Sequence, residues 1–295
     1  MNERWNWDSA WPAPAKLNLF LHVVGRRADG YHLLQTVFRF VGHGDSLRFS
    51  PRADGRVTLA RPLPGVPPES DLTVRAARLL RDETGCREGV EIDVEKRLPP
   101  GGGLGGGSSD AATVLLALNH LWRTGVPRRR LQEMGLALGA DVPVFVAGEN
   151  AFAEGVGEAL RPVALPPAWY VVLEPPAQTP TALIFGDPRL KRDTPPIAAR
   201  DWRPGFGGND LQPAAVRRFP EIARHLDWLA RFGEARMTGS GACVFAEFAG
   251  EAAAREVLGG LPGDMRGWVA AGLDRHPLRA LDDEAERVLE KSGKH

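Results

Sequence analysis

The chain has 295 residues, enough for one large domain or for two domains of roughly 150 residues each. Its 37 Lys and Arg residues balance its 37 Asp and Glu residues, so the formal net charge is zero. A neutral chain lacks the broad positive field that binds nucleic acids or anionic membranes, and we expect neither partner. The hydrophobic content of 43% indicates a packed protein.

Cysteine usage and hydropathy indicate the compartment. Cys86 and Cys243 are far apart and form no CxxC motif, which favours two reduced thiols. No stretch approaches the 18 apolar residues of a membrane helix, and the first residues lack the apolar segment of a signal peptide. We therefore expect a cytoplasmic location.

Strands dominate the first predicted elements. Between residues 13 and 49, Leu17, Leu19 and Leu21 alternate with less apolar residues, and a turn signal stands at 27–30. The segment 51–70, rich in Pro, Gly and Arg, is expected to be a loop or an edge strand. Asp71 is a suitable N-cap for a predicted helix over 72–83. Alternation over 90–95 predicts a half-buried strand.

Glycine is over-represented, with 34 residues or about 12% of the chain against about 7% on average. Six of the seven residues over 101–107 are glycine. Ser108, Ser109 and Asp110 follow, and all are good N-cap types, so a helix is predicted to start at Ser108. The segment therefore combines a strand, a glycine loop and a helix, which disfavours a plain mobile linker.

Strands and helices intermix in the rest of the chain. Helices are predicted over 129–138, 211–218, 220–231 and 250–259, and strands over 169–173, 242–248 and 267–273. The Pro-rich region 175–205 is expected to be irregular, and the charged tail 279–295 to be a peripheral helix or disordered. This mixture favours an α+β protein.

The glycine loop has the composition of an anion site. Glycines allow a ligand to approach the backbone closely, and successive N–H groups with a helix N-terminus bind phosphate. Lys96 and Arg97 lie just upstream, which favours a nucleoside triphosphate. The Gly-Lys-Ser/Thr of a Walker A motif is absent. GxGxxG is matched, but the acidic residue that a dinucleotide site needs about 20 residues later is not evident, so that alternative is rejected.

Three segments in this order resemble the motifs of the GHMP kinase superfamily. They are Pro14-Ala-Lys-Leu-Asn-Leu19, the loop Pro99–Ala112, and Thr238-Gly-Ser-Gly-Ala-Cys243. Further segments resemble one family within it, the 4-diphosphocytidyl-2-C-methyl-D-erythritol kinases: Arg27-Ala-Asp-Gly-Tyr-His32, Gly105–Asp110 and Gly139-Ala-Asp-Val-Pro-Val-Phe145. The resemblance extends from about residue 12 to residue 278.

This resemblance implies a fold and an activity. The implied fold is an α+β, two-domain GHMP kinase fold: an N-terminal domain like domain 2 of ribosomal protein S5 over 1–158, a C-terminal ferredoxin-like α/β sandwich over 159–278, and the tail 279–295. The implied reaction is ATP-dependent, Mg²⁺-assisted phosphorylation of the 2-hydroxyl of the small-molecule substrate 4-diphosphocytidyl-2-C-methyl-D-erythritol, in the non-mevalonate isoprenoid pathway.

The resemblance also implies residue roles. Asp141 is the expected general base, because a tertiary alcohol needs help to lose its proton. Lys16 is expected to activate Asp141 through its positive charge and to orient the substrate hydroxyl. Asn18, on the same strand face, is expected to bind substrate. Tyr31 and His32 are expected to bind the cytosine by stacking and hydrogen bonding. Phe185 is the expected second stacking face, and Thr181 a contact to the diphosphate or erythritol.

The expected ATP contacts cluster around the glycine loop. They are Leu72, Lys96, Pro99, Gly101, Gly102, Gly103, Leu104, Gly105, Gly106, Gly107, Ser108 and Ser109. Asp71 departs from the Asn that the family often has near adenine, so capping is its expected role. Two alternatives stay open: a GHMP kinase for another alcohol such as homoserine or mevalonate, and a non-catalytic nucleotide-binding regulator. Oligomeric state and metal ligands are left open.

Overall fold

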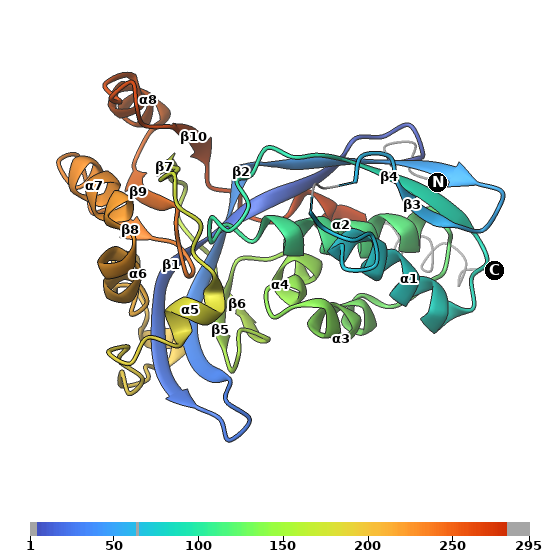
Figure 1. Cartoon of the computed structure of the whole chain (residues 1–295), viewed down its shortest axis with the longest axis horizontal. Coiled ribbons are helices and arrows are strands. Elements are labelled where there is room, and N and C mark those ends of the chain that lie inside the picture. Colours follow the sequence, from blue (N-terminus) through green and yellow to red (C-terminus); the bar gives the residue numbers. More distant parts are fainter. Residues whose placement is uncertain (1–4, 63–64, 282–295) are drawn as a thin grey trace, which may run out of the picture.

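The computed structural model describes residues 5–62 and 65–281 and contains two sheets (Figure 1). The first sheet is built around β2, which pairs with β1 along one edge and with β4 and β5 at the two ends of its other edge. Its strands are β1 (Trp11–Arg26), β2 (His32–Arg52), β3 (Val57–Leu59), β4 (Gly89–Glu95), β5 (Ala151–Glu154) and β6 (Ala159–Pro162). β3 is the edge strand expected within 51–70.

Helices cover one face of this sheet and bury the first core cluster (Figure 1). They are α1 (Leu72–Thr84), α2 (Gly106–Leu121), α3 (Arg128–Leu138) and α4 (Val142–Ala147). The predicted cap of α1 is confirmed, because the Asp71 carboxylate accepts the backbone N–H of Thr73 at 2.8 Å. The apolar face of α2 packs on β1, which places the preceding glycine loop against that strand.

The second sheet has the order β10-β7-β9-β8 and is antiparallel throughout. Its strands are β7 (Trp169–Leu173), β8 (Arg236–Met237), β9 (Val244–Phe248) and β10 (Gly267–Ala271), with helices α6 (Gln212–Arg218), α7 (Pro220–Leu229) and α8 (Glu251–Gly259). The region 175–205 is less irregular than predicted, because it holds α5 (Thr181–Phe185) and the 3₁₀ helix η1 (Ala199–Asp201). A second 3₁₀ helix, η2, spans Pro277–Arg279.

Strand β1 runs through all three core clusters of the molecule. Trp11 and Ala13 lie in the first cluster, under the helices of the first sheet. Leu17 belongs to a second group of buried residues that joins the two sheets. Leu21 and Val23 pack among the residues of the second sheet and its helices. The long β1–β2 hairpin therefore belongs to both halves of the molecule (Figure 1).

The architecture is α+β, as predicted. β6 follows residue 158 but pairs with β5, so the first sheet continues beyond the predicted boundary. We propose that the domain boundary lies over residues 163–168, between β6 and β7. Most of the predicted charged tail, residues 282–295, lies outside the described residues. Within the described ranges, every helix is too short or too polar to cross a membrane.

Candidate active site

The glycine loop is held in a conformation that only glycine adopts readily. Gly101, Gly103 and Gly105 have φ angles of 69°, 74° and 74°. A Cβ added at Gly103 would lie 2.1 Å from the carbonyl oxygen of Thr238. One added at Gly105 would lie 2.9 Å from the Phe145 ring. The loop therefore needs glycine both for its backbone conformation and for its close packing.

The third motif forms a turn that docks on this loop. The Gly241 N–H donates to the Thr238 carbonyl at 3.0 Å, which closes the turn. The N–H groups of Ala242 and Cys243 donate to the carbonyls of Gly101 and Gly102, both at 3.1 Å. This glycine turn, residues 239–241, thus belongs to the wall of the glycine loop.

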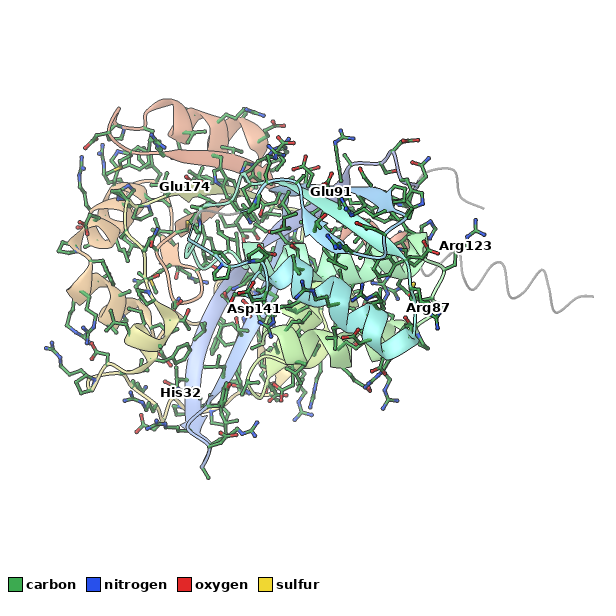
Figure 2. The ribbon with its side chains drawn as sticks, turned by 45° about the vertical axis from the view of Figure 1, so that its right-hand side comes forward. His32, Arg87, Glu91, Arg123, Asp141 and Glu174 are labelled. Atoms are coloured by element: carbon green, nitrogen blue, oxygen red, sulfur yellow. The ribbon has the colours of Figure 1, made fainter. Side chains whose placement is uncertain are left out.

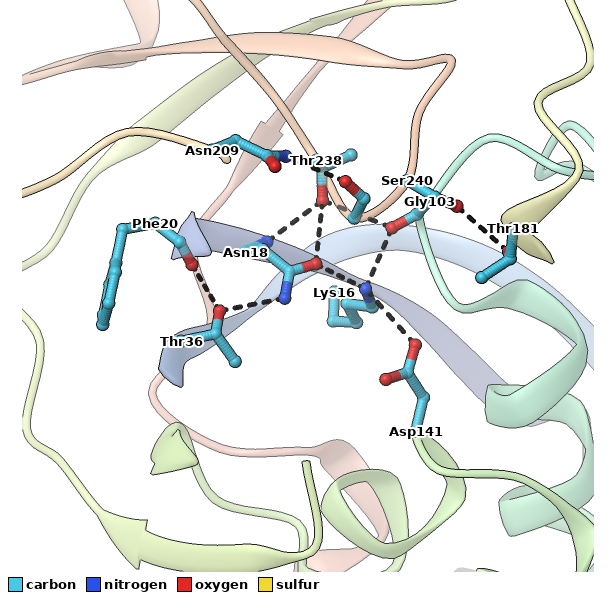
Figure 3. A network of polar contacts seen from close by, with 11 residues as sticks. Lys16, Asn18, Phe20, Thr36, Gly103, Asp141, Thr181, Asn209, Thr238 and Ser240 are labelled. Carbon is cyan, nitrogen blue, oxygen red and sulfur yellow. Dashed lines mark hydrogen bonds and ion pairs between the residues drawn. The ribbon is translucent and has the colours of Figure 1, made fainter. Parts of the chain in front are cut away.

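Lys16 on β1 meets Asp141, the residue before α4, beside the glycine loop (Figure 3). The Lys16 Nζ lies 3.3 Å from Asp141 Oδ2, and it donates to Asn18 Oδ1 at 2.6 Å and to the Gly103 carbonyl at 3.0 Å. An ammonium has three N–H donors, so these contacts fix its position. Asp141 makes no capping hydrogen bond, and its side chain is 35% exposed against 3% for that of Lys16.

Asn18 lies in a buried polar chain that joins the two sheets (Figure 3). Its Nδ2 donates to Thr36 Oγ1 at 2.9 Å, and its backbone N–H donates to Thr238 Oγ1 at 3.0 Å. With Oδ1 accepting from Lys16, both polar groups of the Asn18 side chain have a partner within the protein. It positions Lys16 in this structure, a role that sequence reasoning did not assign to it.

Lys96 precedes the glycine loop and lies against two buried carboxylates. Its Nζ forms ion pairs with Asp45 and, at 2.8 Å, with Asp110. Burial opposes the charge of Lys96, but the carboxylates of Asp110 and Asp45 outweigh it and raise the pKa of the ammonium. Burial, reinforced by Asp45, raises the pKa of Asp110 to about 7, although Lys96 opposes this.

Asp45 and Asp110 were missed from the sequence. Asp45 also accepts the backbone N–H groups of Arg97 at 2.6 Å and Leu98 at 2.9 Å, so it ties the chain before the glycine loop to β2. Exposed and half-buried residues of β2 surround Asp45, so no local sequence pattern marks its side chain as buried. Asp110 was considered only as a helix N-cap.

The two serines after the loop do different things. Helix α2 begins at Gly106, not at Ser108 as predicted, because Gly105 takes the capping position with a left-handed backbone and no side-chain cap. The Ser109 hydroxyl is buried and donates to the Pro14 carbonyl at 2.8 Å. Ser108 faces the cleft instead, and within the described residues its hydroxyl has no hydrogen-bond partner.

The far end of the cleft lies near the turn of the β1–β2 hairpin. Figure 2 shows His32 toward this turn and Asp141 nearer the helices of the first sheet. Tyr31 is 64% exposed, and the rings of His32 and Phe185 are 4.9 Å apart and tilted by 35°. Phe185 also packs against the core of the second sheet. Thr181 Oγ1 lies 3.1 Å from Ser240 Oγ, so α5 touches the glycine turn.

A single cleft of about 1110 Å³ connects these parts. It is lined by all the site residues predicted from the sequence except Ser109: Lys16, Asn18, Tyr31, His32, Leu72, Lys96, Pro99, Gly101, Gly102, Gly103, Leu104, Gly105, Gly106, Gly107, Ser108, Asp141, Thr181 and Phe185. Arg192, which sequence reasoning did not single out, also lines it. The cleft has room for a nucleotide and a second elongated molecule.

Comparisons with known proteins agree with this geometry. The family described as GHMP kinases N terminal domain matches residues 71–149, and GHMP kinases C terminal matches residues 197–266. A 4-diphosphocytidyl-2-C-methyl-D-erythritol kinase from Dechloromonas aromatica is 63% identical over 92% of this chain and 99% of its own length. The chain belongs to the 4-diphosphocytidyl-2-C-methyl-D-erythritol kinase family.

A second kinase of this family is equally similar, and a solved structure from the family is similar at lower identity. The kinase of that name from Thiobacillus denitrificans is 63% identical over 92% of this chain and 98% of its own length. A crystal structure of 4-(cytidine 5'-diphospho)-2C-methyl-D-erythritol kinase superposes with a TM-score of 0.78 and 38% identity, over 90% of this chain and 99% of that one. The predicted two-domain GHMP kinase fold is therefore confirmed.

Kinases for other alcohols share the fold at greater distance. Mevalonate kinase from Methanococcus jannaschii superposes with a TM-score of 0.66 but only 15% identity, over 90% of this chain and 98% of that one. Within the GHMP superfamily, the chain is thus a kinase of the 4-diphosphocytidyl-2-C-methyl-D-erythritol kinase family. Mevalonate and homoserine kinases are distant relatives.

Proposed function

We propose that this protein transfers the γ-phosphoryl group of ATP to the 2-hydroxyl of 4-diphosphocytidyl-2-C-methyl-D-erythritol, a step of the non-mevalonate isoprenoid pathway. The observation that carries the proposal is the ion pair of Lys16 and Asp141 at 3.3 Å. It lies between a phosphate-binding loop and an aromatic pocket in one cleft. Family membership supports the choice of substrate.

Asp141 is the proposed general base. The substrate hydroxyl oxygen attacks the γ-phosphorus in line, the bond from that phosphorus to the β-phosphate oxygen breaks, and the hydroxyl proton goes to Asp141. ADP and the 2-phosphate leave without a covalent enzyme intermediate. A carboxylate that is partly exposed to the cleft and does not cap its helix is free to take this proton.

Lys16 is proposed to hold Asp141 and to offset negative charge on the transferring group. Its ammonium is buried and fixed by Asn18 and Gly103, so it needs no rearrangement when the phosphate arrives. The N-terminus of α2 and the backbone N–H groups of the glycine loop supply the remaining positive potential. This local field explains how a chain of zero net charge could hold two anionic substrates.

Mg²⁺ is proposed as the partner of ATP. Among the described residues, no three acidic, His or Cys side chains gather into a metal cage. This fits an ion held mainly by substrate phosphates with few protein oxygens. The Ser108 hydroxyl, half-buried in the cleft and unpartnered there, suits such a contact, and the ion would neutralise phosphate charge. The unpaired thiols of Cys86 and Cys243 support a cytoplasmic location as part of the proposal.

The test is an assay of ADP release with a panel of alcohols, followed by ³¹P NMR of the product. We expect ADP only with the cytidine substrate, and a new phosphomonoester on the tertiary carbon. Turnover of mevalonate or homoserine in its place would assign a different kinase. Absence of ADP with every alcohol would indicate a nucleotide-binding regulator.

A further inference from the structure

Arg192 lies between the two aromatic groups at the hairpin end of the cleft. Its Nε donates to Nε2 of His32 at 3.1 Å. Its Nη2 donates to the carbonyls of Phe185 and Asp187, both at 2.9 Å, and its Nη1 donates to the Leu190 carbonyl at 3.0 Å. One guanidinium therefore fastens His32 to the end of α5 and to the turn that follows it.

This contact determines where His32 carries its hydrogen. Guanidinium nitrogens donate hydrogen bonds and do not accept them, so the ring nitrogen facing Arg192 must carry a lone pair. Burial, and then the positive charges of Arg192 and Arg26, lower the pKa of His32 and keep the ring neutral. A neutral imidazole with its lone pair on Nε2 has its hydrogen on Nδ1.

The Nδ1 of His32 is available to a ligand. In the part of the chain that the structure describes, the only hydrogen bond of the His32 ring is the one from Arg192 to Nε2. His32 lines the cleft beside Phe185, with the ring centroids 4.9 Å apart. The ring therefore offers a donor at the place where the proposed function puts the substrate base.

We propose that Arg192 is a positioning residue that fixes His32 as its Nδ1–H tautomer and holds it beside Phe185, so that the cleft selects a base with a hydrogen-bond acceptor on its ring edge. The choice of base rests on the proposed function. Cytosine has adjacent acceptors at O2 and N3, whereas uracil carries a hydrogen on N3. A fixed donor would thus favour the cytidine substrate over its uridine analogue.

The first test needs no substrate. Long-range ¹H–¹⁵N NMR of the ligand-free enzyme distinguishes the two tautomers, and the H32Q spectrum assigns the His32 signals. We expect the hydrogen on Nδ1 in the wild type and a shift toward the Nε2–H form in R192M. A wild-type ring with its hydrogen on Nε2 would overturn the proposal.

The second test is kinetic, with R217M as the matched control. Arg217 binds the Asp187 carboxylate at 3.1 Å and so anchors the same turn without touching His32. We expect R192M to raise the KM for the cytidine substrate about tenfold, equivalent to about 1.4 kcal/mol, with kcat and the KM for ATP within about twofold. In R192M the preference for the cytidine substrate over its uridine analogue should also fall. R217M should change neither this preference nor the KM for the cytidine substrate.

Two further outcomes decide the interpretation. If R217M raises the KM as much as R192M does, Arg192 only supports the turn and the proposal is wrong. In an H32N background, R192M should add no further increase in KM, because its effect passes through His32. If the wild type does not phosphorylate the cytidine substrate, the proposed function fails, while the NMR result still decides whether Arg192 sets the tautomer.

Discussion

The ammonium of Lys16 and the carboxylate of Asp141 lie 3.3 Å apart but differ sharply in exposure, at 3% and 35% of their side chains. The lysine is a fixed member of the protein interior, since it also binds Asn18 and Gly103. The carboxylate of Asp141 faces the cleft and makes no capping hydrogen bond to its helix. The pair therefore combines a rigid positive charge with an accessible proton acceptor.

Replacing Asp141 with Asn tests the general base. Asn has the same shape and can still accept a hydrogen bond from Lys16, but it cannot take a proton. We expect kcat to fall by about 10²–10⁴-fold, with KM values for both substrates within about twofold. ADP release measures the turnover, and thermal unfolding checks the fold. Near wild-type turnover would remove Asp141 from this role.

Tyr31 tests the aromatic pocket. Its side chain is 64% exposed at the rim of the cleft, so Y31A should leave the unfolding temperature unchanged. Loss of stacking on a base is worth about 1–3 kcal/mol, which corresponds to a KM for the cytidine substrate raised about 5- to 150-fold. Y31F is the control, because it keeps the aromatic face. If Y31A leaves this KM unchanged, Tyr31 does not bind the base.

Ser108 and Ser109 form a matched pair of neighbouring serines. S108A removes a hydroxyl that faces the cleft, and we expect a higher KM for ATP with unchanged stability. S109A leaves the Pro14 carbonyl without its buried donor, and we expect a loss of about 1 kcal/mol in unfolding free energy with the KM for ATP nearly unchanged. Kinetics and urea unfolding of both variants check this; the reverse pattern would contradict the assignment.

Alanine substitutions at Gly103 and Gly101 distinguish the effect of steric clash from that of backbone strain. Both have left-handed φ angles, but a Cβ at Gly103 would strike the Thr238 carbonyl, whereas one at Gly101 meets nothing within 4 Å. We expect G103A to be less stable than G101A by about 1–3 kcal/mol, because the glycine turn must move away. Denaturant unfolding of the two variants gives the difference directly. Equal stabilities of G103A and G101A would show that the glycine loop and the glycine turn are not tightly packed against each other.

The raised pKa of Asp110 predicts that the free energy of unfolding depends on pH. Its pKa is raised to about 7 from an ordinary value of 3.8, so the folded state holds a proton more tightly than the unfolded state. Its contribution to stability is present below about pH 4 and is lost as the pH rises through about 7. D110N should therefore gain stability relative to the wild type over that range. Urea unfolding at several pH values measures this difference.

D54N is the control for this series. A hydrogen bond from Arg52 lowers the pKa of Asp54 to about 2, so its titration ends below the range tested. The stability difference between D54N and the wild type should then show no trend above about pH 5. A pH-independent difference for D110N as well would show that Asp110 does not titrate in this range.

Much of the fold and most of the site follow from the sequence, because they rest on local patterns. Alternation identified β4, Asp71 marked the start of α1, and three short motifs marked the walls of the cleft. The predicted start of α2 at Ser108 is wrong, because it rests on side-chain capping, whereas Gly105 in a left-handed conformation occupies the N-cap position.

The residues that were missed act through distant partners. Arg192 lies in a Pro-rich segment without periodicity, and only the folded chain brings it to His32. Asp45 is separated from Lys96 by three elements, β3, α1 and β4, and their contact depends on how β2 pairs with β4. No local pattern contains such a pairing. Long-range polar contacts of this kind therefore need the structure.

The passage of β1 through all three cores has a consequence for how the protein denatures. Trp11 at one end of β1 packs in the core of the first sheet, and Val23 at the other end packs in the core of the second. Loss of packing in one half would release one end of β1 and so weaken the packing of the strand in the other half. The two halves are thus expected to melt in one cooperative transition, with no partly folded species that keeps a working cleft. We expect that neither half, expressed alone, yields a stable fragment.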